Sequence, residues 1–172
     1  MKRFFKELTG LSCDVCIVDI ETTGLSYDKG AKIVSLGTLY NGVAEVIIRE
    51  ANNDREFDVA VENVKGRFAN MEKASYVKKF EEYFLGIPIE IELQSSPYEP
   101  KREICVLTYL EDPFNGRGIR TKYAWQSYLF HGNRQCLKDI VDHNFACLIN
   151  ECCIWLVKLY NETVSDYSTL GR

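Results

Sequence analysis

Short apolar runs separated by turn residues make up most of the first fifty residues. The runs CDVCIVDI, AKIVSLGTLY and VAEVIIRE occupy residues 13–20, 31–40 and 43–50. Each run is short, apolar and rich in β-branched residues, which predicts a strand. Asn41-Gly42 separates the last two runs, and Asn-Gly between two strands is a strong hairpin signal. The pattern therefore predicts a three-stranded meander.

The middle of the chain mixes helical and strand patterns. Residues 53–70 are ambiguous and fit a helix, whereas KKFEEYFLG at residues 78–86 predicts a helix that ends at Gly86. We expect two further strands at residues 87–93 and 102–110. The prolines of SSPYEPK predict a loop between these two strands.

Helical patterns dominate the C-terminal third. Candidate helices cover residues 121–132, 133–141 and 143–162, and the glycine-rich segment FNGRGIR before them predicts a loop. Strands come first along the chain and helices last. This order predicts one α/β or α+β domain over residues 1–172, with a mixed central sheet and flanking helices.

Composition and charge limit the classes of function. Of the 172 residues, 46% are hydrophobic and the net charge is −4, so general non-specific binding to nucleic acid is not expected. An enzyme that handles phosphates through bound cations remains compatible with this charge. No apolar run approaches the roughly 20 residues that span a bilayer, and the N-terminus lacks a secretory pattern. We therefore expect a cytoplasmic protein without a membrane segment.

The cysteines do not predict a disulfide framework. Their number is odd and their spacing irregular: Cys13, Cys16, Cys105, Cys136, Cys147, Cys152 and Cys153. Cys13-Asp-Val-Cys16 has metal-ligand spacing, but no second pair matches it. We therefore expect the cysteines to be small buried hydrophobic residues.

Two acids one residue apart end the first predicted strand. On a strand, Asp19 and Glu21 point to the same face and Ile20 points to the other. Neighbouring carboxylates repel each other unless a cation lies between them, and Mg²⁺ or Mn²⁺ prefers such oxygen ligands. A pair of solvated acids at the end of a strand is the alternative interpretation.

The segment around these acids resembles a known motif. VDIETTGL, followed by KIVSLG, is similar to the first motif of the DEDD 3′–5′ exonuclease superfamily, which has the ribonuclease-H-like fold. The resemblance covers roughly the first 50 residues. It implies that this strand is central in the sheet and that Asp19 and Glu21 bind two catalytic metal ions, Mg²⁺ or Mn²⁺. Thr22, Thr23 and Gly24 would then contact the substrate.

The second motif of that family has a variant here. ASYVKKFEEYFLG carries Phe80-Glu81 where the family has Phe-Asp, and Val77 replaces an expected Asn. The resemblance makes Glu81 the third carboxylate of the metal site. A solvated helix face is the alternative for Glu81, and Asp112 in TYLEDPF competes for the same role.

IVDHNFACLINE resembles the third motif of the family. It makes His143 the general base, and the neutral pKa of an imidazole suits that role. The family has an Asp four or five residues later, where this chain has Cys147 and Leu148. Weaker candidates for the missing acid are Asp142 and Glu151.

The resemblance implies a divalent-metal-dependent 3′–5′ exonuclease acting on single-stranded DNA or RNA. Arg117 and Arg120, in the glycine-rich loop, are candidates for phosphate contacts, and Tyr123 and Trp125 for stacking on bases. A solvated loop and core aromatic residues are the alternative interpretation. The altered second and third motifs support an alternative, a catalytically degenerate nuclease fold that binds nucleic acid or protein. The sequence leaves open DNA or RNA, exonuclease or endonuclease, and the oligomeric state.

Overall fold

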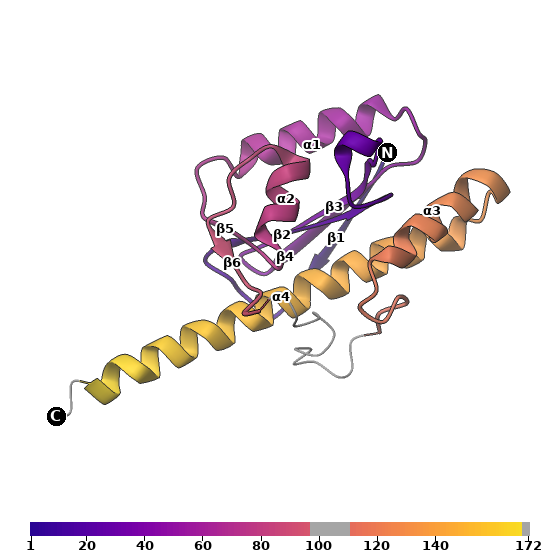
Figure 1. Cartoon of the computed structure of the whole chain (residues 1–172). Helices are drawn as coiled ribbons and strands as arrows, with labels where there is room; N and C mark the ends of the chain where they lie inside the picture. Colours follow the sequence, from indigo (N-terminus) through magenta and orange to yellow (C-terminus); the bar gives the residue numbers. More distant parts are fainter. Residues whose placement is uncertain (97–110, 170–172) are drawn as a thin grey trace.

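One mixed sheet forms the centre of the molecule, and helices cover both of its faces (Figure 1). The computed structural model describes residues 1–96 and 111–169. The strands are β1 Lys2–Glu7, β2 Cys16–Thr22, β3 Ile33–Tyr40, β4 Val43–Ile48, β5 Lys73–Ser75 and β6 Ile91–Glu92. They follow the order β1-β4-β3-β2-β5-β6, antiparallel from β1 to β2 and parallel from β2 to β6. The predicted α/β class with a mixed sheet is confirmed.

The predicted meander corresponds to β2, β3 and β4. Asn41 and Gly42 connect β3 to β4 with φ angles of 48° and 76°. Both residues are therefore left-handed, as a two-residue type I′ hairpin turn requires. This turn fixes the register in which Tyr40 pairs with Val43, so the predicted hairpin is confirmed.

The helices lie in two layers, one on each face of the sheet (Figure 1). They are α1 Arg55–Arg67, α2 Lys78–Leu85, α3 Ile119–His131 and α4 Arg134–Thr169, with a short 3₁₀ helix, η1, at Tyr27–Lys29. Helix α1 begins at Asp54, whose side chain accepts a hydrogen bond from the backbone N–H of Phe57 at 3.0 Å. Helix α2 ends at Gly86, whose φ of 64° confirms the predicted C-terminal cap.

Alternation along β2 divides the core in two. Val18 and Ile20 pack with α1 and α2, whereas Ile17 packs with α3 and α4. Asp19 and Glu21 share the face of Ile17, because side chains two residues apart on a strand point the same way. The predicted orientation of the two acids, opposite to Ile20, is therefore confirmed.

Some predicted boundaries were wrong. Residues 133–141 and 143–162 were expected to form two helices, but α4 is continuous from Arg134 to Thr169. No residue between them breaks a helix, because neither Gly nor Pro occurs there. Most of SSPYEPK and all of the strand predicted at residues 102–110 lie outside the described residues.

A disulfide joins Cys13, just before β2, to Cys152 on α4. This corrects the expectation that the cysteines would all be small buried hydrophobic residues. Cys16 does fit that expectation, since it is free and buried within β2, and burial raises the pKa of its thiol to about 12. The disulfide anchors α4 to the sheet at the start of β2.

Part of α4 is long and apolar enough to cross a membrane. This part is Arg134–Glu162, but 67% of its apolar window is buried inside the molecule. A mostly buried core helix of a soluble protein can have the same length and composition. Length and composition are therefore weak evidence for a membrane span.

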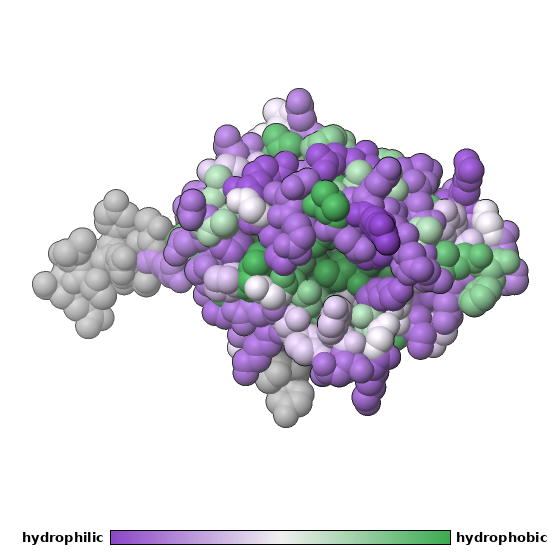
Figure 2. Space-filling view, turned by 90° about the horizontal axis from the view of Figure 1, so that it is seen from above, coloured by the Kyte–Doolittle hydropathy of each residue, from purple (hydrophilic) through white to green (hydrophobic). Residues whose placement is uncertain are grey.

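The face covered by α1 and α2 carries a cleft that is lined largely by polar residues. Viewed from above relative to Figure 1, hydrophobic residues gather near the middle and are bordered by hydrophilic ones (Figure 2). A cleft of about 540 Å³ lies between α1 and the end of α2, and Arg49 and Asp58 are among its lining residues. These two groups form an ion pair with each other, with Arg49 Nη2 at 2.5 Å from Asp58 Oδ1. We therefore assign no ligand to this cleft.

Candidate active site

A second cleft, of about 590 Å³, lies at the carboxyl ends of the parallel strands β2 and β5. Ligands bind at such ends in many α/β proteins. The described lining residues come from β2 and the loop after it, from β5–α2, from the loop before α3 and from α4. They are Asp19, Ile20, Glu21, Thr22, Gly24, Leu25, Tyr76, Val77, Phe80, Glu81, Gly116, Gly118, Ile119, His143 and Cys147.

Asp19 lies near the middle of β2 and is 4% exposed. The side-chain amide of Asn144, on α4, donates hydrogen bonds to Asp19 Oδ2 at 3.1 Å and to Ser35 Oγ at 3.4 Å. The amide thus fixes one carboxylate oxygen against the helix. Local sequence patterns do not predict this contact, because Asn144 and Asp19 are 125 residues apart.

Gly37 makes this contact possible. It pairs with Asp19 across the β2–β3 ladder. A Cβ atom at Gly37 would lie 1.8 Å from Asn144 Oδ1 and 2.8 Å from Leu148 Cδ1. Any other residue at this position would push α4 away from the sheet, because real Cβ atoms do not approach other atoms so closely.

Glu21 is 5% exposed and holds two partners. Its Oε2 accepts a hydrogen bond from the hydroxyl of Thr121, on α3, at 2.6 Å. Its Oε1 lies 3.0 Å from His143 Nε2. The carboxylate therefore links β2 to both C-terminal helices. No local sequence pattern predicts this role of Thr121, because it lies 100 residues from Glu21.

The imidazole of His143 lies between two carboxylates. Its Nε2 faces Glu21, and its Nδ1 lies 2.7 Å from Asp112 Oδ1. Burial opposes a charge on the ring, but Cys147, Glu21 and Asp112 outweigh burial and raise the pKa of His143 well above its usual value. The ring therefore carries a proton on each nitrogen and donates to both acids.

Asp112 organises the loop before α3. Its side chain accepts hydrogen bonds from the backbone N–H groups of Phe114, at 2.8 Å, and Gly116, at 2.5 Å. Burial raises the pKa of Asp112, but His143 and these N–H groups lower it to a net value below the usual range. Asp112 was a competitor for the role of third carboxylate, and the structure instead brings it to the far nitrogen of His143.

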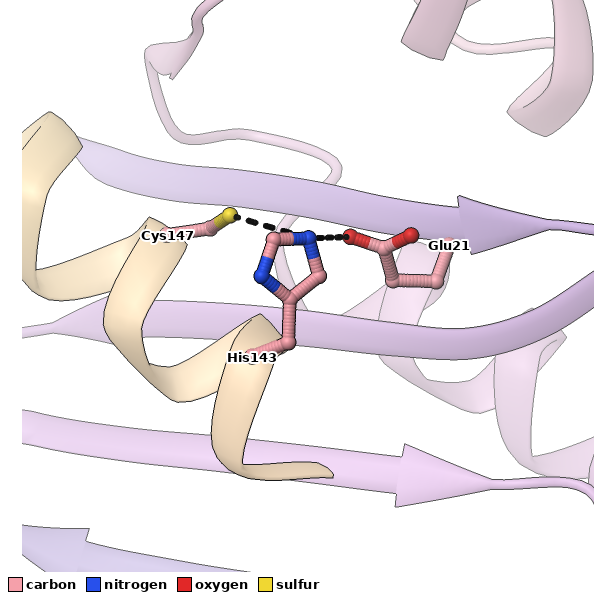
Figure 3. A group of neighbouring side chains, drawn as sticks. All are labelled: Glu21, His143 and Cys147. Atoms are coloured by element: carbon pink, nitrogen blue, oxygen red, sulfur yellow. Dashed lines mark hydrogen bonds and ion pairs between the residues drawn. The ribbon is translucent and has the colours of Figure 1, made fainter. Parts of the chain in front are cut away.

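Cys147 lies one helical turn after His143 on α4. Its Sγ is 3.8 Å from His143 Nε2. One ligand atom from each of Glu21, His143 and Cys147 lies within 4.8 Å of the other two, and all three residues are buried. Figure 3 shows the imidazole between the thiol and the carboxylate. The i, i+4 spacing of His143 and Cys147 is the signal in the sequence for this cluster.

Glu81 lines the same cleft from α2. It is 4% exposed, so it does not lie on a solvated helix face. Four predicted residues from three distant segments, Asp19, Glu21, Glu81 and His143, therefore share one cleft. The cluster of close ligand atoms among the described residues does not include Asp19 or Glu81.

Two weaker candidates lie elsewhere. Asp142 forms an ion pair with Lys138 at 2.5 Å on another side of α4. Glu151 is fully buried two turns beyond His143 and is not among the described lining residues of the cleft. Because a helix turns by about 100° per residue, the side chain of Asp142 points in a different direction from that of His143, which faces the sheet.

The predicted substrate residues divide into two groups. Thr22 and Gly24 line the cleft, whereas the hydroxyl of Thr23 accepts a hydrogen bond from the backbone of Lys32 at 2.9 Å. Arg117 and Arg120 are exposed and are not among the described lining residues, although Gly116 and Gly118, on either side of Arg117, are.

The two aromatic residues proposed to stack on bases also differ. Tyr123 is 62% exposed, whereas Trp125 is 2% exposed and packs in the core. Trp125 is therefore a core aromatic residue, the alternative interpretation, and it cannot stack on a base.

Comparisons of this chain with models of protein families, with curated proteins and with solved structures found no match.

Proposed function

We propose that this protein is a divalent-metal-dependent 3′–5′ exonuclease of the DEDD type, with a ribonuclease-H-like fold. One observation carries the proposal. Three carboxylates and a histidine from β2, α2 and α4 line a single cleft, at the positions that the resemblance assigns to metal ligands and general base. Chance is a poor explanation for the convergence of residues from three separate motifs on one cleft.

The position of β2 supports the same proposal. It has β3 antiparallel on one side and β5 parallel on the other. The first-motif strand of the DEDD superfamily is likewise the central strand and begins a three-stranded meander. The strand order and the acid pair therefore support the same proposal, and they do so through different residues.

The donor set fits magnesium or manganese. Asp19, Glu21 and Glu81 offer carboxylate oxygens, which hard divalent cations prefer, and all three line the cleft. When bound, such cations lower the pKa of water and stabilise the leaving oxygen of a phosphodiester.

His143 is the proton acceptor in this proposal. Asp112 holds its Nδ1 and so points Nε2 at Glu21 and the cleft. In the geometry described here Nε2 is protonated, and a cation on Glu21 would compete with that proton. We therefore expect His143 to accept a proton from water only in the metal-loaded protein.

The walls of the cleft suit a nucleotide base. Leu25, Tyr76, Val77, Phe80 and Ile119 provide an apolar surface next to the acids. Bases stack on aromatic and apolar side chains without strong sequence preference. We infer that the terminal nucleotide of a single strand occupies this space, with its phosphate towards Asp19 and Glu21.

A second candidate function is a degenerate nuclease fold that binds nucleic acid without cleaving it. Cys147 favours it, because it stands four residues after His143, where the DEDD superfamily has a metal-binding Asp. In that case the protein would bind oligonucleotides in the presence of a chelator and never shorten them.

The deciding experiment uses 5′-labelled single-stranded DNA and RNA with Mg²⁺, Mn²⁺ or EDTA. We expect a ladder of products shortened from the 3′ end that requires the metal. Asp19→Asn should abolish the ladder, and Asp142→Asn, an acid on α4 paired with Lys138, should leave it intact. No cleavage by the unaltered protein, or full cleavage by Asp19→Asn, would contradict the proposal.

A further inference from the structure

We propose that Glu21, His143 and Cys147 form a zinc site. The ligands would be Glu21 Oε1, His143 Nε2 and Cys147 Sγ, one carboxylate oxygen, one imidazole nitrogen and one thiolate. Magnesium and manganese sites are built from oxygen, so this site is distinct in chemistry from the one proposed for nucleic-acid cleavage.

The distances between the ligand atoms fit a tetrahedral ion. With zinc bonds of about 2.0–2.3 Å, two ligand atoms of a tetrahedral site lie about 3.3–3.7 Å apart. Here Nε2 is 3.0 Å from Oε1 of Glu21 and 3.8 Å from Sγ of Cys147. These two distances are within a few tenths of an ångström of a zinc geometry, and the carboxylate oxygen and the thiol sulfur lie within 4.8 Å of each other.

The charge of the donor set also fits zinc. One carboxylate and one thiolate neutralise a divalent ion, which matters because all three residues are buried. On binding, Cys147 coordinates as the thiolate and His143 loses the proton on Nε2 to the solvent. Thiolate and imidazole ligands select zinc over magnesium.

Hydrogen-bond partners already orient two of the three ligands. Asp112 lies 2.7 Å from His143 Nδ1, so the imidazole presents its other nitrogen to the ion. Metal-binding histidines usually have such a carboxylate partner. The hydroxyl of Thr121 holds Glu21 Oε2 at 2.6 Å and leaves Oε1 free to face the ring.

Zinc at this site would inhibit the proposed nuclease, an inference that rests on the proposed function. Zinc and manganese would compete for Glu21, and zinc on Nε2 would prevent His143 from accepting a proton. The three ligands lie at the wall of the cleft, so the fourth coordination position faces the space available to solvent.

The test is a titration of the chelator-treated full chain with Co²⁺, without nucleic acid and with the disulfide intact. We expect a thiolate-to-cobalt charge-transfer band that saturates at about one ion per chain and disappears on adding Zn²⁺. Cys147→Ser should lose the band, and Cys136→Ser, a free cysteine on α4 outside the cleft, should keep it. Absence of the band from the unaltered protein, or its survival in Cys147→Ser, would overturn the proposal.

Two further variants guard the interpretation. Circular dichroism should show that Cys147→Ser is folded, with Cys147→Ala as the substitute if it is not. Asp112→Asn should keep the band and weaken cobalt binding about 10- to 100-fold, and an unchanged affinity would overturn the assignment of His143 Nε2.

The nuclease assay separates this inference from the proposed function. Zinc should inhibit the unaltered protein more strongly than Cys147→Ser, and equal inhibition would refute the shared site. A protein that never cleaves nucleic acid would refute the exonuclease proposal and leave the cobalt result unaffected.

Discussion

Glu21 and Glu45 are two buried glutamates on the same sheet, 5% and 4% exposed, that are held in different ways. Glu45, on β4, forms ion pairs with Arg3, at 3.1 Å, and with Arg67. Arginine stays protonated in proteins, so Glu45 is neutralised at every pH of interest. Its role is to join β1, β4 and the end of α1.

Glu21 has partners that can be exchanged. The hydroxyl of Thr121 carries no charge, and the imidazole of His143 can lose its proton or move to a metal ion. Burial alone therefore does not distinguish a structural acid from a reactive one. The chemistry of the partners does.

The largest expected effect tests this distinction directly. Glu21→Gln should lower the proposed metal-dependent nuclease activity by about 10³-fold, roughly 4 kcal/mol in activation free energy, because it removes a proposed metal ligand. Glu45→Gln, the matched change in an equally buried glutamate, should lower activity less than threefold, about 0.6 kcal/mol. Steady-state assays on a labelled oligonucleotide measure both. Similar losses of activity in the two variants would contradict the distinction between a reactive and a structural glutamate.

The second effect concerns stability without metal. His143→Gln should lower the free energy of unfolding by about 3 kcal/mol, because it leaves the carboxylates of Glu21 and Asp112 without the charge between them. Urea unfolding in the presence of EDTA measures it.

The loss of stability caused by His143→Gln should depend on pH. The folded protein raises the pKa of His143 above its unfolded value of 6.5, so the ring contributes full stability below that pH. The contribution declines as the pH rises towards the folded pKa. The stability difference between the unaltered protein and His143→Gln should therefore narrow from pH 6.5 to pH 9, and a difference that widens would contradict the assignment.

The third effect concerns Asp112, which contacts the cleft residue His143. Asp112→Asn should lower nuclease activity about 10- to 100-fold, since it removes the charge that orients and supports His143. Asp58→Asn, which breaks the ion pair with Arg49 on the opposite face, is the control. The ratio of kcat/KM between the two variants is the measurement, and a ratio near one would show that Asp112 has only a structural role.

The smallest effect belongs to Glu45. Glu45→Gln should lower the free energy of unfolding by about 1 kcal/mol, because Arg3 and Arg67 are partly exposed and return to water when the ion pairs are lost. Urea unfolding at low and high salt measures the change. A loss larger than that in His143→Gln would reverse the ranking of the two sites.

The sequence predicted those features that depend on local periodicity. Asp19 and Glu21 had to share a face of β2 because side chains alternate along a strand, and Asn41-Gly42 had to turn because both residues tolerate positive φ. Strand β1 was missed because all six of its residues are exposed, so its sequence does not alternate between apolar and polar positions.

Contacts between distant segments could not be predicted in the same way. Asp112 and His143 are 31 residues apart, and their contact depends on how the loop before α3 folds over α4. The disulfide joins residues 139 positions apart, and cysteine spacing carries no information about pairing over that distance. Tertiary packing alone brings these groups together.

The contact of Asn144 with the sheet has a consequence for sequences related to this one. The amide of Asn144 reaches Asp19 only because Gly37 has no Cβ atom. The two positions should therefore vary together, with glycine at the strand position wherever the helix position is asparagine. A relative with alanine at position 37, asparagine at position 144 and aspartate at position 19 would contradict this coupling. It would show that α4 can lie farther from the sheet and still hydrogen-bond that carboxylate.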